Sequence, residues 1–146
     1  MTNLITGCAG FIGFHLSLQL LKKNKKIIGI DNLNNYYDQK LKRDRLKILK
    51  SYKHFFFYKE SIQSKKIKKI FSKYKIDNVI NLAAQAGVRY SISNPDIYLK
   101  SNLIGFCNLI ELSKEFNVKH FIYASTSSVY GENKKNKFSE KDTIEK

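Results

Sequence analysis

Near its beginning the sequence reads Gly7-Cys8-Ala9-Gly10-Phe11-Ile12-Gly13, in which three glycines have the spacing G-x-x-G-x-x-G. A short apolar stretch, residues 4–6, precedes this run, and apolar residues at helical spacing follow it as far as residue 23. Glycine is required where a backbone turns tightly and approaches a pyrophosphate, and free N–H groups at a helix start attract phosphate charge. The run therefore predicts a phosphate-binding loop between a strand and a helix, and we assign a bound cofactor to Gly7, Gly10, Phe11, Ile12 and Gly13.

An acidic residue ends the next apolar stretch. Residues 27–30 predict a second strand, and Asp31 closes it, with Asn32 beside it in the same expected site. A carboxylate at this position accepts hydrogen bonds from adenosine ribose hydroxyls and repels a 2′-phosphate, so the pattern favours NAD over NADP. Strand, glycine loop, helix, strand and acid in this order is a far more specific signal than glycines alone. The alternative is a purely structural role, in which the glycines only make a turn and Asp31 caps a strand.

Apolar stretches and amphipathic stretches alternate along the rest of the chain. We expect further strands at residues 54–58, 78–83 and 120–124, and helices at residues 11–23, 38–50, 62–74 and 95–116. In the second helix, Leu41, Ile48 and Leu49 are expected to face inward. The strands are apolar throughout, as expected when both faces of a sheet are covered. The sequence thus predicts an α/β fold with a Rossmann-type doubly wound parallel sheet that is cut short after about five strands.

The charge is strongly basic but is distributed without a pattern. The formal net charge is +15, and 27% of the 146 residues are charged. Scattered lysines supply most of the positive charge, whereas arginine occurs only at Arg43, Arg45 and Arg89. A dedicated nucleic-acid surface more often gathers arginines on one face, so we expect no specific nucleic-acid partner. Salt-dependent binding of polyanions through the net charge is kept as an alternative.

No feature of the sequence predicts a membrane or metal partner. No apolar run approaches the roughly 20 residues of a membrane span, and no signal peptide is visible. Cys8 and Cys107 have neither disulfide-framework nor metal-ligand spacing, so we expect a cytoplasmic protein without a metal site. We divide the chain into an incomplete NAD-binding Rossmann domain over residues 1–130 and a polar loop or tail over residues 131–146.

Several segments resemble extended short-chain dehydrogenases, the NAD-dependent epimerase/dehydratase group that acts on nucleotide sugars. These segments are the glycine run, residues 31–33, Leu82-Ala83-Ala84 and residues 125–131. Residues 31–38 and 84–91 are similar to UDP-glucuronate 4-epimerases in particular. The resemblance implies that tightly held NAD takes a hydride from C4 of a UDP-sugar, that the 4-keto sugar turns over, and that the hydride returns to the other face. UDP-glucuronate would thereby become UDP-galacturonate.

The resemblance also implies a cofactor wall beyond the glycine loop. Leu82, Ala83 and Ala84 match the wall that passes under the cofactor, where small side chains leave room for it. Asn102, on the expected long helix, matches a position near the nicotinamide and the substrate. The bland alternative for Asn102 is a polar helix residue that faces solvent.

For the sugar, the resemblance implies a group of polar residues after the fourth and fifth strands. Thr126 matches the catalytic hydroxyl, which would donate a hydrogen bond to the C4 oxygen as charge develops there. Gln85, Ser127 and Ser128 would bind the sugar and its carboxylate, and Arg89 would pair with a pyrophosphate or with the uronate carboxylate. The alternatives are strand-end capping for the hydroxyls and a surface ion pair for Arg89. Related dehydratases carry Asp-Glu where this chain has the two serines, so epimerisation is favoured over dehydration.

Two departures from the family pattern limit the expected activity. The family's catalytic Tyr-x-x-x-Lys pair falls well after Thr126, beyond Lys146, and the C-terminal substrate domain is likewise absent. Ser61 stands where the family usually has an aspartate near the adenine amino group. We therefore expect this chain alone to be inactive and the fifth strand to be an exposed edge. A homodimer through helix 95–116 is a further expectation from the family.

Three alternatives stay open. The chain could belong to another nucleotide-sugar epimerase, such as one for UDP-glucose. It could be a non-catalytic NAD-binding or interaction module that kept the fold and lost the chemistry. It could also be a basic polyanion binder, whose affinity would fall steeply with added salt.

Overall fold

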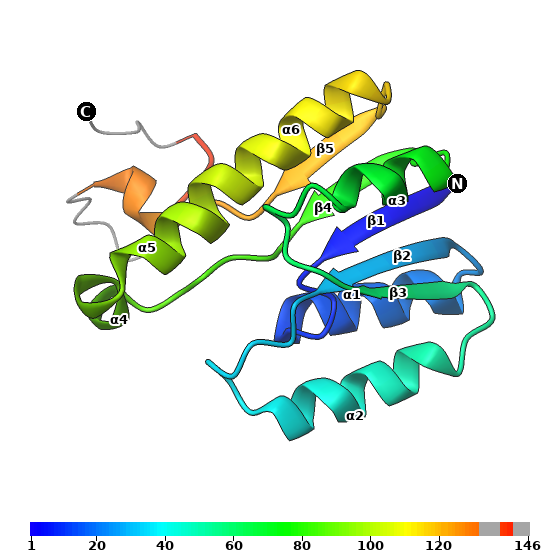
Figure 1. The fold of residues 1–146 in the computed structure, drawn as a ribbon, viewed down its shortest axis with the longest axis horizontal. Helices are drawn as coiled ribbons and strands as arrows, with labels where there is room; N and C mark the ends of the chain where they lie inside the picture. Colours follow the sequence, from blue (N-terminus) through cyan, green and yellow to red (C-terminus); the bar gives the residue numbers. More distant parts are fainter. Residues whose placement is uncertain (132–137, 142–146) are drawn as a thin grey trace.

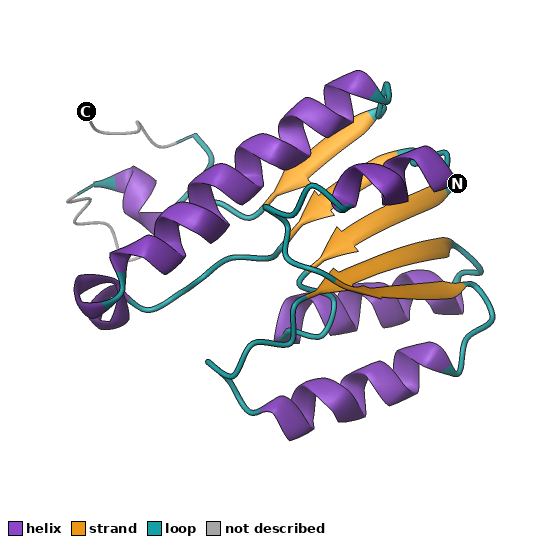
Figure 2. Cartoon of the chain, viewed as in Figure 1, coloured by secondary structure: helices purple, strands orange, loops and turns teal. Residues whose placement is uncertain are grey.

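Five parallel strands form one sheet, which carries helices on both faces (Figures 1 and 2). The computed structural model describes residues 1–131 and 138–141. The spatial order is β3-β2-β1-β4-β5. The strands are β1 (Thr2–Thr6), β2 (Lys26–Asp31), β3 (Phe55–Lys59), β4 (Asn78–Asn81) and β5 (His120–Tyr123). The chain goes outward from β1 to one side and then crosses to the other, which confirms the doubly wound Rossmann-type fold. Ligands bind at the carboxyl ends of strands where the order reverses in this way.

The helices divide into two layers. Buried side chains from α1 and α2 pack on one face of the sheet, and those from α3 and α6 pack on the other. Neighbouring residues of one strand serve opposite layers, since Leu4 belongs to the second and Ile5 to the first. The helical segments are α1 (Phe11–Lys22), α2 (Gln39–Lys50), α3 (Ile67–Lys73), α4 (Val88–Ser93), α5 (Pro95–Tyr98), a π-helix η1 (Leu99–Ile104), α6 (Gly105–Glu115) and a 3₁₀ turn η2 (Ser127–Tyr130).

The inward face of α2 differs from the prediction. Leu41 and Ile48 are 47% and 48% exposed, so their inward placement was wrong, whereas Leu49 is buried as predicted. Lys42 and Leu46 are buried with Leu49, and these three residues share one helical face at spacings of four and three. A lysine therefore occupies the inward position that the sequence analysis gave to a leucine.

Two further boundaries differ. The expected third helix starts only at Ile67, although Ile62 is buried in the loop before it. The long helix from residue 95 is present but is divided by η1, and the short helix α4 precedes it. The tail expected over residues 131–146 lies largely outside the described residues, and residues 138–141 form neither helix nor strand.

Strand β5 is an edge of the sheet within the described part of the chain, as predicted. It pairs with β4 only, and its Ile122 and Tyr123 side chains are 43% and 54% exposed. The central strands β1 and β2 are buried almost throughout. No helix among residues 1–131 and 138–141 is long and apolar enough to cross a membrane.

Candidate functional site

A cleft of about 630 Å³ opens where the carboxyl ends of β1, β2 and β4 meet. Its volume is within the usual range for small-molecule sites. Nearly every residue that the sequence analysis assigned to a cofactor lines this cleft: Gly7, Gly10, Phe11, Ile12, Gly13, Asp31, Asn32, Leu82, Ala83 and Ala84. These residues come from three separate segments, around the carboxyl ends of β1, β2 and β4, and the fold brings them together.

The glycine run forms a tight loop that leads directly into α1. Gly7 has a positive φ of 66°, and the Gly10 amide donates to its carbonyl oxygen at 2.9 Å. A Cβ at Gly13 would overlap that same carbonyl oxygen, so only glycine lets α1 pack this closely on the loop. Gly10 caps α1 without a side-chain hydrogen bond, and the first turn contains no acidic residue. The first amides of α1 are thus available to an anion in the cleft.

Asp31 holds the loop from the opposite side. Its carboxylate is buried and accepts hydrogen bonds from the Ala9 amide at 3.1 Å and the Leu33 amide at 2.9 Å. Lys42 Nζ lies 3.9 Å from Asp31 Oδ1. Burial and then this carboxylate raise the pKa of the Cys8 thiol well above its ordinary value, so Cys8 stays a neutral core side chain. Asp31 therefore ties the glycine loop to the end of β2 while lining the cleft.

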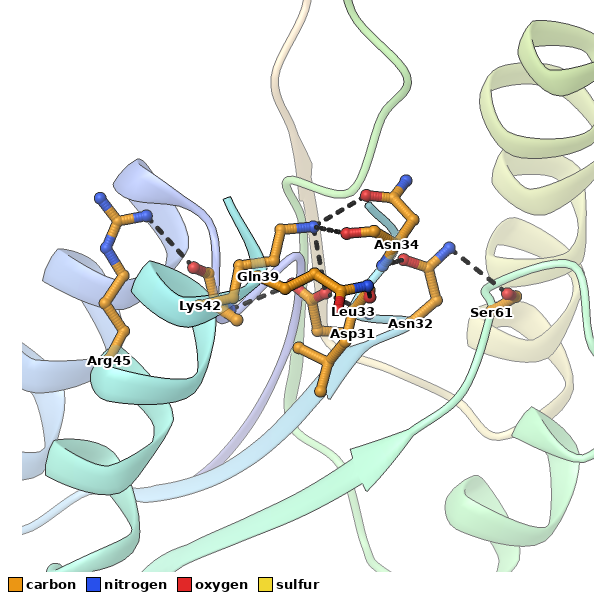
Figure 3. A network of polar contacts seen from close by, with 9 residues as sticks. Asp31, Asn32, Leu33, Asn34, Gln39, Lys42, Arg45 and Ser61 are labelled. Carbon is orange, nitrogen blue, oxygen red and sulfur yellow. Dashed lines mark hydrogen bonds and ion pairs between the residues drawn. The ribbon is translucent and has the colours of Figure 1, made fainter. Parts of the chain in front are cut away.

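Two basic residues of α2, Lys42 and Arg45, complete this part of the cleft (Figure 3). Neither was predicted from the sequence. Lys42 Nζ donates to Asn34 Oδ1 at 2.9 Å and to the Asn34 carbonyl oxygen at 3.3 Å. The Arg45 guanidinium donates to the Ala9 carbonyl oxygen at 3.3 Å and lies 5.8 Å from the centre of the Phe11 ring. A signal for Lys42 was present in the sequence, because it stands four residues before Leu46 on the apolar face of the helix.

Asn32 lies at the cleft rim beside the departure noted at Ser61. Asn32 Nδ2 is 3.5 Å from Ser61 Oγ, and Asn32 Oδ1 accepts from the Asn34 amide at 3.0 Å. Glu60, the neighbouring carboxylate, forms an ion pair with Lys66 at 3.5 Å. Ser61, two residues after β3, therefore offers a hydroxyl where the family resemblance implies a carboxylate.

The wall after β4 is fixed by side chains that bind its backbone. Thr6 Oγ1 is buried and accepts hydrogen bonds from the Leu82 and Ala83 amides at 3.1 and 3.0 Å. The Asn102 side chain accepts from the Gln85 amide at 2.8 Å and donates to the Gln85 carbonyl oxygen at 2.9 Å. Both polar atoms of Asn102 are thus committed to the wall. Neither Asn102 nor Gln85 is among the cleft-lining residues, so their assignments to cofactor and sugar stay predictions.

The expected sugar-binding residues stand apart from the cleft lining. Thr126 Oγ1 accepts from the Ser128 amide at 3.2 Å and caps η2, and all three hydroxyl residues 126–128 are exposed. Arg89 is exposed on α4, and its side chain makes no hydrogen bond or ion pair within the described ranges. These side chains follow β4 and β5, which are paired neighbours, but their catalytic and binding roles stay predictions.

The chain contains the bare Tyr-x-x-x-Lys spacing at two unexpected places. Tyr36 is followed by Lys40, but this pair spans the loop before α2 and the first turn of that helix. Tyr130 is followed by Lys134, which is outside the described residues, and the Tyr130 ring stacks on Phe138 at 4.8 Å between centroids. Neither pair has the place in the sequence that the family resemblance gives to the catalytic pair.

A second hollow, of about 690 Å³, lies between α2 and β3 and is lined by basic side chains. Its lining includes Arg43, Lys47, Lys50 and Lys59, all of them exposed. Of the motif residues only Leu33 lines it, and every polar residue of its lining within the described ranges is exposed. The glycine-loop cleft is therefore the better candidate site.

Comparison with known proteins identifies a family and several relatives that the chain resembles over almost its whole length. A family model described as GDP-mannose 4,6 dehydratase matches residues 4–145. Protein CapI of Staphylococcus aureus is 48% identical over 146 residues, which are 99% of this chain and 43% of that protein. A UDP-glucuronate 4-epimerase of Thermodesulfobacterium geofontis is 50% identical over 128 residues, which are 87% of this chain and 40% of that protein.

A solved structure shows the same fold. The crystal structure of UDP-glucuronic acid 4-epimerase from Bacillus cereus in complex with UDP-glucuronic acid and NAD has a TM-score of 0.87 and 36% identity to this chain. The match covers 99% of this chain and 46% of the Bacillus protein. The chain thus spans less than half the length of each of these relatives. The expected resemblance to nucleotide-sugar epimerases is confirmed.

Proposed function

Because the chain belongs to the family described as GDP-mannose 4,6 dehydratase, we propose that it is the NAD-binding N-terminal portion of a UDP-glucuronate 4-epimerase. The observation that carries the proposal is one cleft in which the uncapped start of α1 faces the buried Asp31 carboxylate. The names of the relatives support epimerisation within a family that is named for dehydration. Ser127 and Ser128, in place of an acid pair, support the same choice.

The residues around the cleft fit a dinucleotide. The amides at the start of α1 would receive the pyrophosphate, and the absence of a side chain at Gly10 leaves the approach open. The free lone pairs of Asp31 would accept the ribose hydroxyls, and Lys42, 3.9 Å away, would help to orient this carboxylate. Bound NAD would supply the acceptor, and later the donor, of the hydride at C4 of the sugar. The small residues Ala83 and Ala84 would leave room for it along the wall.

On the sugar side, the chain offers hydrogen-bond donors and one cation. The Thr126 hydroxyl would donate to the C4 oxygen, and the guanidinium of Arg89 would pair with the uronate carboxylate. Both side chains follow paired strands at the carboxyl edge of the sheet. Their exposure is consistent with a pocket that needs further chain to close it. We therefore propose residues 1–130 as the NAD-binding domain, UDP-glucuronate as the partner after completion by a C-terminal half, and dimerisation through residues 95–116.

The experiment that tests the proposal is a calorimetric titration of the 146-residue chain with NAD and with NADP. We expect saturable binding of one NAD per chain and weaker binding of NADP, because Asp31 repels a 2′-phosphate. Repeating the NAD titration at high salt separates this site from polyanion binding through net charge, which falls steeply with salt. A folded chain that binds neither dinucleotide would contradict the proposal.

A turnover assay tests the remaining alternatives. We expect no conversion of UDP-glucuronate by this chain alone, since it lacks the family's tyrosine-lysine pair at its usual place. Supplying the C-terminal half of a relative should restore conversion, with UDP-glucuronate preferred over UDP-glucose. NAD binding that never supports turnover in any such complex would favour the non-catalytic module instead.

A further inference from the structure

Two loops on opposite sides of the cleft touch through aromatic rings. Tyr36 lies in the loop between β2 and α2, and Tyr90 lies on α4, after the β4 wall. Their ring centroids are 4.9 Å apart, with an angle of 50° between the ring planes. In Figure 1 the loop after β2 extends toward α4, although α2, β3, α3 and β4 lie between them in the chain. The contact therefore joins two segments that the sheet alone would leave apart.

Both segments contribute directly to the cleft lining. Tyr37 and Asn34 line it from the β2–α2 loop, and Ala84 and Ala86 line it from the β4–α4 loop. Tyr36 also stacks edge-on against Tyr37, at 4.7 Å between centroids. Widening the cleft between these loops would therefore break the Tyr36–Tyr90 contact.

The seat of this contact is shaped for the tyrosine. Gly87 has a φ of 100°, and a Cβ on it would overlap the Tyr36 hydroxyl oxygen. No L-residue adopts this backbone easily, and a side chain here would displace the Tyr36 hydroxyl. The position thus needs glycine for its conformation and for the approach of this hydroxyl.

The β4–α4 side of the contact is itself held in place. The Tyr98 hydroxyl donates toward the Ala86 carbonyl oxygen at 2.7 Å and the Gly87 carbonyl oxygen at 2.5 Å. The Tyr98 ring lies 6.4 Å from Tyr90. Desolvation and then Tyr36 raise the pKa of Tyr98 above its ordinary value, which already lies well above neutral pH. The seat of Tyr36 is therefore a fixed surface rather than a loose loop.

We propose that the Tyr36–Tyr90 contact is a strap that retains the dinucleotide by holding the two lining loops together across the cleft. Tyr36 and Tyr90 are positioning residues, since neither lines the cleft itself. This inference rests on the proposed function, because it takes NAD as the occupant. An epimerase that returns the hydride to its own substrate gains from a cofactor that stays bound between turnovers.

The test is a double-mutant cycle on the rate at which NAD leaves the chain, measured by rapid mixing with a competing dinucleotide. Tyr36→Ala and Tyr90→Ala should each speed dissociation about three- to tenfold, as expected for the loss of one or two aromatic contacts. The double variant should release NAD more slowly than the product of the two single effects predicts, because the Tyr36–Tyr90 contact is lost in either single variant. Tyr36→Phe keeps the ring and should release NAD at the wild-type rate.

Two further variants bracket the result. Gly87→Ala leaves both rings in the chain but pushes Tyr36 from its seat, so it should also speed release. Tyr123→Ala removes an exposed tyrosine from β5 and should leave the rate unchanged. Additive effects of the two alanine variants, or rates equal to wild type, would overturn the strap.

A measurement without ligand separates this inference from the proposed function. Hydrogen exchange of the ligand-free chain should be faster over residues 86–91 in Tyr36→Ala than in wild type. A wild-type chain that binds no NAD removes the proposed function and the retention role with it. Normal NAD binding with an unchanged release rate and unchanged exchange removes the strap alone.

Discussion

The carboxyl edge of the sheet has two sides that differ in how far their functional groups are assembled. Around β1 and β2, the glycine loop, Asp31 and Lys42 share one cleft and are linked by hydrogen bonds and an ion pair. After β4 and β5, Arg89 and Thr126 are exposed. The proposed cofactor side can therefore be tested by NAD binding to this chain, whereas the proposed sugar side is tested by turnover in a complex with a C-terminal half.

The largest effect on NAD binding is expected at Gly13, where the glycine loop leaves no space for a side chain. Gly13→Val places a branched side chain against the Gly7 carbonyl and the Cys8 backbone, neither of which can move without moving α1. We expect no measurable NAD binding and a loss of about 1–3 kcal/mol in the free energy of unfolding. Titration and urea denaturation measure the two effects. The exposed Val88→Ala is the matched control, and a Gly13→Val chain that binds NAD normally would break the comparison.

The next effect concerns the carboxylate. Asp31→Asn keeps the size of the side chain but removes the charge that favours ribose hydroxyls and repels a 2′-phosphate. We expect NAD binding about ten- to thirtyfold weaker, from the loss of a charged hydrogen-bond acceptor, and a smaller preference for NAD over NADP. Parallel titrations with both dinucleotides measure this ratio. An unchanged ratio would mean that Asp31 only ties the loop to β2.

A smaller effect is expected at Lys42. Lys42→Met keeps the buried stem but removes the ammonium that contacts Asn34 and faces Asp31. We expect NAD binding about three- to fivefold weaker, consistent with one or two lost polar contacts. The exposed Lys47→Met on the same helix should leave affinity unchanged. Equal losses in both variants would point to net charge rather than to this site.

The smallest effect tests the other side of the edge. Thr126→Ala should change NAD affinity less than twofold and the free energy of unfolding by about 0.5–1 kcal/mol, because Thr126 caps only the short turn η2. In a complex that restores turnover, the same change should lower kcat. A large loss of NAD affinity in Thr126→Ala would show that Thr126 and the glycine-loop cleft belong to one site.

The sequence was sufficient for those parts of the fold and site that depend on short-range pattern. The glycine loop and Asp31 lie within one strand-helix-strand unit, so their spacing alone placed them together. Leu41 and Lys42 show the limit, because helical phase depends on how α2 rests against the sheet. An apolar leucine took the exposed position and lined the cleft, while a lysine was buried beside a carboxylate.

Contacts between distant loops could not be predicted. A Cβ at Gly87 would overlap the side chain of Tyr36, which lies in a different loop. Neither local sequence indicates that these two residues are in contact. The same holds for Asn102, whose partner Gln85 lies on another element. The sequence pattern identified Asn102 as polar on a helix, but only the fold shows that both of its amide atoms bind backbone.

The π-helix η1 makes the helix that starts at Pro95 sensitive to changes in chain length. Tyr98 and Asn102, before and within η1, both bind the β4–α4 loop. Each residue added or removed between them would rotate one relative to the other by about a quarter of a turn. Evolutionary insertions and deletions should therefore be excluded from the interval between these two residues and be better tolerated near the end of α6. The number of residues between Tyr98 and Asn102 is thus constrained by the contacts of both side chains with the β4–α4 loop, whereas the length of the helix near the end of α6 is not.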